Sequence, residues 1–150
     1  MLKYQTEIEL ALPLQKVAAI LGDPEQNEYW MKGLVNMRPV KGEPMQKGAQ
    51  TYFEFELGRR NSEMLEEIIE NQLPERLVTS YRAKGVYNIV ENRLKALDSD
   101  RTHYTVVHEF QFSGIYKLLG ILMGKAFKKQ SAKYLQDFKR YAEQSIRVND

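Results

Sequence analysis

The sequence predicts an α+β fold in which a series of antiparallel strands precedes one long C-terminal helix. Three observations support this prediction. Residues 2–10 alternate between an apolar and a polar face, which is the pattern of a half-buried strand. Further short alternating segments, separated by turn residues, continue as far as Gly114. Beyond Gly114 an inner stripe that begins with Leu119, Met123 and Phe127 recurs at steps of three or four, as in an amphipathic helix.

Two short helices are expected between the first strand and the rest of the sheet. Pro13 suits a first helical turn and Gly22 supplies a stop, so one helix is expected between them. Asp23 is followed by a proline, a pairing typical of the cap and first turn of a second helix. This second helix is expected to end near Trp30 and Gly33.

Six further strands are expected before the long helix, with short turns between them. They are expected at residues 34–40, 50–57, 64–71, 77–83, 86–97 and 101–112. Such short connections favour antiparallel pairing between consecutive strands. The inner face of residues 64–71 stays open, because each of its two alternating sets contains acids.

Length and composition indicate one soluble domain spanning residues 1–150. The chain has no cysteine, which excludes disulfides and thiolate metal sites and suits a reducing cytoplasm. Its N-terminus lacks the apolar segment of a signal peptide, so a cytoplasmic location is expected. The apolar stretch at residues 115–123 is interrupted by Lys117 and is too short to span a bilayer. With a net charge of only +2, nucleic acid is not an expected partner.

Several local segments stand out along this order of elements. They are Ile8–Pro13 leading into Val17, the residues Asp23 and Trp30, Glu70–Leu77, and Asp98–Thr102. Together with the order of elements they resemble the START/Bet v 1-like superfamily (SRPBCC), which includes polyketide cyclase/dehydrase and lipid-transport proteins, across essentially the whole chain. The resemblance implies a helix-grip fold, in which a curved seven-stranded antiparallel sheet wraps around the long C-terminal helix and leaves a cavity between them. It implies no particular activity, because one fold serves many functions.

A cavity of this kind is expected to have apolar walls with a few polar groups. Plain core packing is the competing interpretation of the same inward faces. Thr79 and Asn92 share these faces, so they are further candidates for inward polar groups. The residues expected to bind a ligand are Phe53, Phe55, Tyr81, Asn88, Val90, Tyr104, Val106, His108, Phe110, Met123, Phe127 and Ser131.

His108 is the inward polar residue most directly suited to chemistry. It lies two residues from both Val106 and Phe110 and therefore shares their face of the strand. A neutral imidazole there could orient a ligand or transfer a proton, and a histidine satisfied by its neighbours is the competing interpretation. His103 is five residues away and faces the opposite side, so the two histidines do not predict a metal site. No metal and no cofactor are expected.

Lys125, Lys129 and Lys133 form a stripe along the predicted helix, with Lys128 beside it. Next to the apolar residues 121–123, this stripe is compatible with transient contact with an anionic membrane, although such a stripe is usually a solvated helix face. A solvated helix face is the competing interpretation.

The leading functional prediction is binding or transport of a small hydrophobic or amphipathic ligand, without catalysis, between the sheet and the C-terminal helix. The alternative is a polyketide cyclase/dehydratase-like enzyme that uses His108 as acid or base. A third is an interaction module that resembles the Hsp90-activator relatives of this fold and uses the outer face of the sheet. An enzyme needs several converging titratable groups, and His108 is the one good inward candidate, so binding ranks first.

Overall fold

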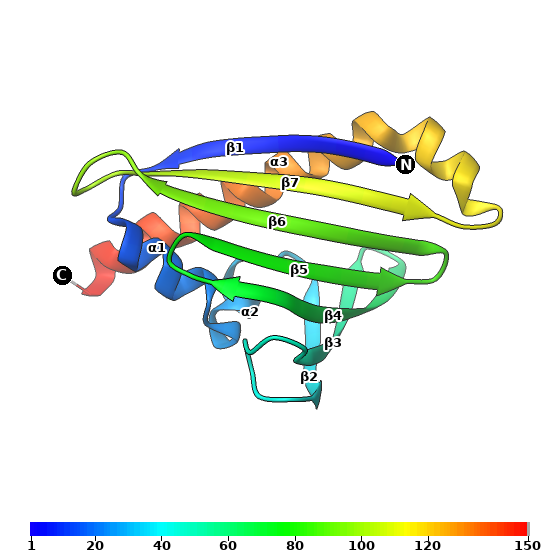
Figure 1. The fold of residues 1–150 in the computed structure, drawn as a ribbon, viewed down its shortest axis with the longest axis horizontal. Helices are drawn as coiled ribbons and strands as arrows, with labels where there is room; N and C mark the ends of the chain where they lie inside the picture. Colours follow the sequence, from blue (N-terminus) through cyan, green and yellow to red (C-terminus); the bar gives the residue numbers. More distant parts are fainter. Residues whose placement is uncertain (150) are drawn as a thin grey trace.

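Seven antiparallel strands form one sheet, and a long helix lies across one of its faces (Figure 1). The computed structural model describes residues 1–149, and the side chains of residues 1–145. The elements are β1 (Leu2–Leu10), α1 (Leu14–Leu21), the 3-10 turn η1 (Pro24–Gln26), α2 (Asn27–Trp30), β2 (Leu34–Lys41), β3 (Gln50–Leu57), β4 (Arg60–Gln72), β5 (Arg76–Ala83), β6 (Val86–Ala96), β7 (Thr102–Phe112) and α3 (Tyr116–Asn149). The strand order is β1-β7-β6-β5-β4-β3-β2. The predicted α+β helix-grip fold is therefore confirmed.

Strand β4 is longer than the sequence predicts and has an irregular register. It begins at Arg60, because the preceding hairpin turn is tighter than expected. The register shifts between Ile68 and Glu70, where a β-bulge interrupts the pairing with β5. The bulge displaces the alternation by one residue, so no single alternating set follows the whole strand. The face toward α3 carries Met64, Glu66 and Ile68, which answers the question that the sequence leaves open.

The most tightly packed part of the core lies where the C-terminal half of α3 meets β1 and α1. Leu10, Val17, Phe138 and Ala142 are each no more than 1% exposed. Trp30, at the end of α2, packs edge-on against Phe138 with ring centroids 5.1 Å apart. These contacts fix α3 to the sheet at this end.

Toward its start, α3 faces the sheet with glycines rather than with large apolar residues. A Cβ atom added to Gly120 would lie 2.4 Å from the ring of Phe112, and one added to Gly124 would lie 3.3 Å from Leu2. The backbone of the helix therefore approaches the sheet closely at both positions. The same stripe continues through Phe127 at the helical spacing.

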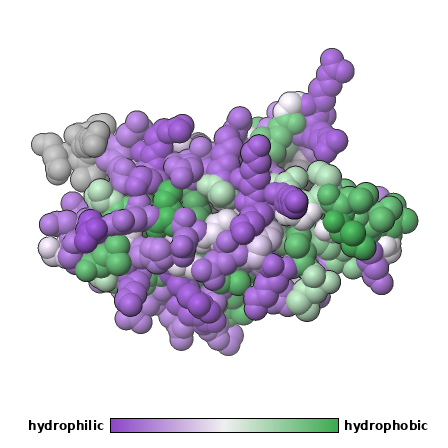
Figure 2. All heavy atoms as spheres, turned by 90° about the horizontal axis from the view of Figure 1, so that it is seen from above, coloured by the Kyte–Doolittle hydropathy of each residue, from purple (hydrophilic) through white to green (hydrophobic). Residues whose placement is uncertain are grey.

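The prediction that Leu119 and Met123 continue the inner stripe of α3 is wrong. Leu119 is 39% exposed and Met123 42% exposed. Each precedes a sheet-facing glycine by one residue and is therefore rotated by about 100° around the helix. Both belong to a group of exposed side chains that we call the apolar tip of α3, which Figure 2 shows at one end of the molecule. The apolar tip consists of Ile115, Leu118, Leu119, Ile121, Leu122 and Met123. Within residues 1–149, no helix has an apolar run long enough to cross a membrane.

Replacing Gly120 by alanine is expected to lower the free energy of unfolding by about 1–3 kcal/mol, the usual effect of overpacking. The added methyl group would overlap the ring of Phe112, which stacks on Phe127 with centroids 6.0 Å apart. Gly124→Ala is the matched control, because its neighbour is the flexible end of Leu2. The gain in helix propensity, up to about 1 kcal/mol, should leave that variant as stable as the wild type or more so. Equal losses for both variants in urea titrations would contradict the close approach at Gly120.

Candidate ligand-binding cavity

A cavity of about 330 Å³ lies between the sheet, α3 and the segment around α2. Its walls come from β1, from β3 to β7 and from α3, with further residues from the segment between α1 and β2. Eleven of the twelve residues predicted to bind a ligand line this cavity, and Met123 lies outside it on the apolar tip. The eleven are Phe53, Phe55, Tyr81, Asn88, Val90, Tyr104, Val106, His108, Phe110, Phe127 and Ser131. Their placement around one space is established, and their role in binding stays a prediction.

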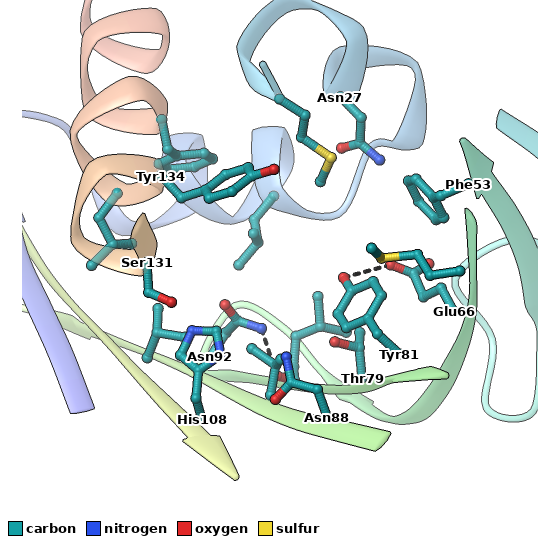
Figure 3. A pocket seen from close by; sticks show the side chains of 18 of the residues that line it. Asn27, Phe53, Glu66, Thr79, Tyr81, Asn88, Asn92, His108, Ser131 and Tyr134 are labelled. Atoms are coloured by element: carbon teal, nitrogen blue, oxygen red, sulfur yellow. Dashed lines mark hydrogen bonds between the residues drawn. The ribbon is translucent and has the colours of Figure 1, made fainter. Parts of the chain in front are cut away.

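The register of the sheet arranges the polar cavity residues in rows that run across the strands. In one row, Glu66 of β4 lies directly opposite Tyr81 of β5, which lies opposite Asn88 of β6. The next row contains Thr79 of β5 and His108 of β7, with one residue of β6 between them. Cβ atoms of directly opposite residues lie about 5 Å apart. The polar groups therefore form a band on the wall that faces α3, as Figure 3 shows.

Five buried polar side-chain atoms have no hydrogen-bond partner among the described residues, and all five belong to residues that line the cavity. They are Thr6 Oγ1, Trp30 Nε1, Thr79 Oγ1, Asn88 Oδ1 and His108 Nδ1. Leaving such an atom unsatisfied costs about 1–3 kcal/mol, and native proteins contain few of them. Their concentration around one space is the pattern expected of a cavity whose contents complete the missing hydrogen bonds.

Asn92 and Tyr104, in contrast, satisfy each other within the protein. The Tyr104 hydroxyl donates to Asn92 Oδ1 at 2.5 Å, and Asn92 Nδ2 donates to the carbonyl of Leu77 at 3.1 Å. Burial raises the pKa of Tyr104 above its ordinary value of 10. Of the inward polar candidates named from the sequence, Asn92 therefore supports the fold, whereas Thr79 Oγ1 and Asn88 Oδ1 have no hydrogen-bond partner among the described residues.

His108 is held in the wall by aromatic stacking. Its ring stacks on Tyr4 with centroids 5.0 Å apart and on Phe110 at 5.9 Å. Desolvation lowers the pKa of His108 to about 4, so the imidazole is neutral at physiological pH. Tyr4, which was not among the predicted site residues although its alternation faces inward, also shares a hydrogen bond of 2.6 Å with Ser131 Oγ. This bond joins β1 to α3 beside His108.

Glu66 is the one acid among the described cavity residues, and it was not among the predicted site residues. Its Oε2 atom accepts a hydrogen bond of 2.7 Å from the hydroxyl of Tyr81. Burial raises the pKa of Glu66 to about 7, and the hydrogen bond from Tyr81 opposes this rise. Burial and the neighbouring Glu66 raise the pKa of Tyr81 well above 10. Knowledge that Glu66 pairs with Tyr81 across β4 and β5 would have identified it as a cavity residue. The register of β4 cannot be predicted from the sequence, because the β-bulge shifts it.

The family described as polyketide cyclase / dehydrase and lipid transport matches residues 1–143 of the chain. The chain belongs to this family. The resemblance to the SRPBCC, or Bet v 1-like, superfamily is thereby confirmed. Binding of hydrophobic ligands is typical of the polyketide cyclase/lipid-transport fold, and the cavity provides the space for it.

Solved structures share the fold of this polyketide cyclase/lipid-transport family member at low sequence identity. The Zhui aromatase/cyclase from Streptomyces sp. R1128 is 13% identical with a TM-score of 0.76, over 96% of this chain and 94% of that one. Ara h 8.0201 is 13% identical with a TM-score of 0.74, over 95% and 97% of the two chains. A conserved protein from Geobacillus kaustophilus is 16% identical with a TM-score of 0.77, over 96% and 97%. At these identities the likeness shows the fold alone, and no curated protein matches the chain.

Replacing Glu66 by glutamine is expected to stabilise this family member at high pH and to have little effect at low pH. Between the ordinary pKa of 4.5 and the raised value of about 7, the folded state binds more protons than the unfolded state. The contribution of Glu66 to the free energy of unfolding therefore falls as the pH rises through this window. The glutamine variant lacks this loss, so its advantage over the wild type should grow by about 1–3 kcal/mol between pH 5 and pH 8. Urea titrations at the two pH values measure the difference.

Glu56→Gln is the matched control for this measurement. Glu56 is exposed near the end of β3 and does not line the cavity. Its replacement should leave the difference in stability between pH 5 and pH 8 as it is in the wild type. If Glu66→Gln also showed the wild-type difference, the raised pKa of Glu66 would be contradicted.

Proposed function

We propose that the chain binds and carries a small amphipathic molecule in the cavity between the sheet and α3. The observation that supports this most directly is the combination of apolar walls with five buried polar atoms that lack partners among the described residues. Apolar walls favour the transfer of a ligand from water by about 0.8 kcal/mol for each buried CH₂ group. Polar atoms in fixed positions then favour a ligand whose polar groups meet them. A cytoplasmic location is part of the proposal, and the cysteine-free sequence supports it.

We prefer binding without turnover to a cyclase/dehydratase-like activity in which His108 acts as acid or base. Acid–base catalysis is most effective when the pKa of the catalytic group lies near the working pH. Desolvation lowers the pKa of His108 to about 4, so the imidazole has no excess proton to donate and is a weak base. Its stacking partners are Tyr4, whose pKa burial raises, and Phe110, and neither supplies a second acid or base at neutral pH. These properties support a residue that orients a ligand.

The proposal predicts that a larger side chain at Phe127 obstructs the cavity. Phe127 lines the cavity and stacks on Phe110 with centroids 5.3 Å apart. Phe127→Trp is expected to weaken ligand affinity by about tenfold, because overpacking by a few atoms typically costs 1–3 kcal/mol. Native mass spectrometry of protein purified without detergent identifies a co-purifying ligand. Titration of that ligand, or of a fluorescent fatty-acid probe, then measures the change.

Met123→Trp is the matched control, because Met123 lies one turn earlier on α3 and outside the cavity. This variant should bind as the wild type does. Wild-type affinity in the Phe127→Trp protein would place the ligand elsewhere. Recovery of a chemically altered ligand from the wild type, but not from a His108→Gln variant that still binds it, would support the enzyme alternative instead.

We propose in addition that the ligand is exchanged at an anionic membrane surface. The apolar tip of α3 exposes neighbouring large side chains at one end of the molecule (Figure 2). A contiguous apolar patch on a surface is typical of an interaction site. No acid occurs between Glu109 and Asp137, and this stretch carries Lys117, Lys125, Lys128, Lys129 and Lys133. A basic surface beside an apolar one favours an anionic bilayer.

The predicted membrane lysines differ in their surroundings. Lys125, Lys128, Lys129 and Lys133 are all exposed on α3. Lys133 lies 3.9 Å from a carboxylate oxygen of Asp137, which reduces the charge it offers to a membrane. Of these four lysines, Lys125, Lys128 and Lys129 therefore contribute most of the proposed attraction.

Replacing Ile121 and Leu122 together by serine is expected to abolish flotation of the protein with vesicles that contain phosphatidylserine. The double change removes two strongly exposed side chains from the centre of the apolar tip. Lys125→Gln combined with Lys129→Gln should weaken vesicle binding by about tenfold, since each base near an anionic surface contributes about 1 kcal/mol. Added salt should weaken binding further.

Val35→Ser combined with Val40→Ser is the control, because these residues of β2 are 52% and 55% exposed and lie outside the apolar tip. The control should float as the wild type does. Equal binding to neutral phosphatidylcholine vesicles, or binding that the tip substitutions leave unchanged, would contradict the proposed surface.

A further inference from the structure

We infer that the ligand carries an amine, which Glu66 receives as a hydrogen-bond acceptor. This inference rests on the proposed ligand-binding function and names the chemistry of the ligand's polar end. It follows from one row of the sheet, which crosses β4, β5 and β6.

Glu66, Tyr81 and Asn88 stand side by side in this row. The pairing of β4 with β5 places Glu66 opposite Tyr81, and the pairing of β5 with β6 places Tyr81 opposite Asn88. Figure 3 shows Glu66 joined to Tyr81 by a hydrogen bond, with Thr79 and Asn88 beside Tyr81. All four residues line the cavity, with Tyr81 between Glu66 and Asn88.

This row, with Thr79 of the neighbouring row beside it, presents acceptors that the protein itself does not use. The hydroxyl of Tyr81 donates to Glu66 Oε2 at 2.7 Å, and Oε1 receives no hydrogen bond from the described residues. Asn88 Oδ1 and Thr79 Oγ1 are buried without a partner among those residues. An ammonium group has three N–H donors, whereas a hydroxyl has one. An amine beside Glu66 therefore brings more donors to this part of the wall than a hydroxyl does.

The charge of the cavity favours the same group. Among the described residues that line it, Glu66 is the one acid, and there is no lysine or arginine. A ligand carboxylate or phosphate would meet a like charge and no cation, which is costly away from water. An ammonium forms a charge-assisted hydrogen bond with Glu66 while the bond from Tyr81 stays in place. The wall therefore selects an amine over an acid with the same apolar chain.

Among the described cavity side chains, Glu66 alone is expected to titrate between pH 6 and pH 8. Its pKa is raised by burial to about 7. His108 has its pKa lowered to about 4. The other titratable groups are phenols whose pKa burial raises above 10, namely Tyr4, Tyr81, Tyr104 and Tyr134. An alkylammonium stays protonated over this range, as lysine does. Affinity for an amine should therefore rise with pH as Glu66 ionises.

Isothermal titration calorimetry with octylamine, octanol and octanoate tests the inference on the full chain. At pH 8 octylamine is expected to bind about tenfold or more tightly than octanol, and octanoate more weakly than both. The affinity for octylamine should fall by about tenfold from pH 8 to pH 6, and that for octanol should stay constant. Glu66→Gln should remove the amine preference and its pH dependence. Glu56→Gln should behave as the wild type.

Different failures of this experiment have different meanings. Octanoate binding as tightly as octylamine, or an amine preference that survives in Glu66→Gln, would overturn the inference, and octanol binding would still uphold the proposed function. If none of the three ligands bound the wild type, the proposed function would fail and the inference with it.

A second variant tests the assignment to Glu66. Tyr81→Phe keeps the carboxylate of Glu66 but removes the hydroxyl that donates to it, so the midpoint of the pH dependence of octylamine affinity should move upward. An unmoved midpoint would place the titrating group elsewhere and overturn the assignment to Glu66.

Discussion

The attachment of α3 to the sheet mainly at one end is the constraint on which the rest of the structure depends. Near α1 the helix is fixed by Phe138 and Ala142, which are almost fully buried against Leu10 and its neighbours. Toward its start it meets the sheet through glycines and through the hydrogen bond between Tyr4 and Ser131. Side chains of a single helix do not fill the interior of a curved seven-stranded sheet between these two regions. The cavity is the part of the interior that remains unfilled.

The polar atoms on the cavity wall reduce the stability of the empty protein. Natural proteins retain such destabilising groups mainly where function requires them. The cost of burying Glu66 and His108 appears in their pKa values. Burial raises the pKa of Glu66 to about 7 and lowers the pKa of His108 to about 4. Between pH 4.5 and pH 6.5, the ordinary pKa values of the two side chains, their effects on the free energy of unfolding oppose each other. Rising pH lowers stability through Glu66 and raises it through His108, so neither effect alone is visible in the wild type.

The alternation of the strands predicted most of the cavity wall, because a period of two ties the direction of a side chain to its position. Phe53 and Phe55, for example, both lie on the wall as expected. The placement of Met123 failed because the apolar residues of α3 and its glycines form adjacent stripes, and the pattern does not tell which stripe meets the sheet. Glu66 escaped notice because both alternating sets of residues 64–71 contain acids, and the β-bulge between Ile68 and Glu70 adds a shift that the pattern does not show. The unsatisfied polar atoms and the volume of the cavity depend on distances between elements far apart in sequence, which no local pattern records.

The surface of α3 and the acid inside the cavity favour the same class of ligand by different physics. An anionic bilayer attracts the lysines beside the apolar tip, and it also concentrates cationic amphiphiles at its surface. Phe127, which lines the cavity, follows the tip by one helical turn, so docking there brings the cavity close to this supply. If the proposed amine enters the cavity from a bilayer, Glu66 replaces an anionic headgroup as its counter-charge, so the ammonium keeps a charged partner in an apolar space. A carboxylate ligand has neither advantage, because the anionic surface repels it and no lysine or arginine among the described residues lines the cavity.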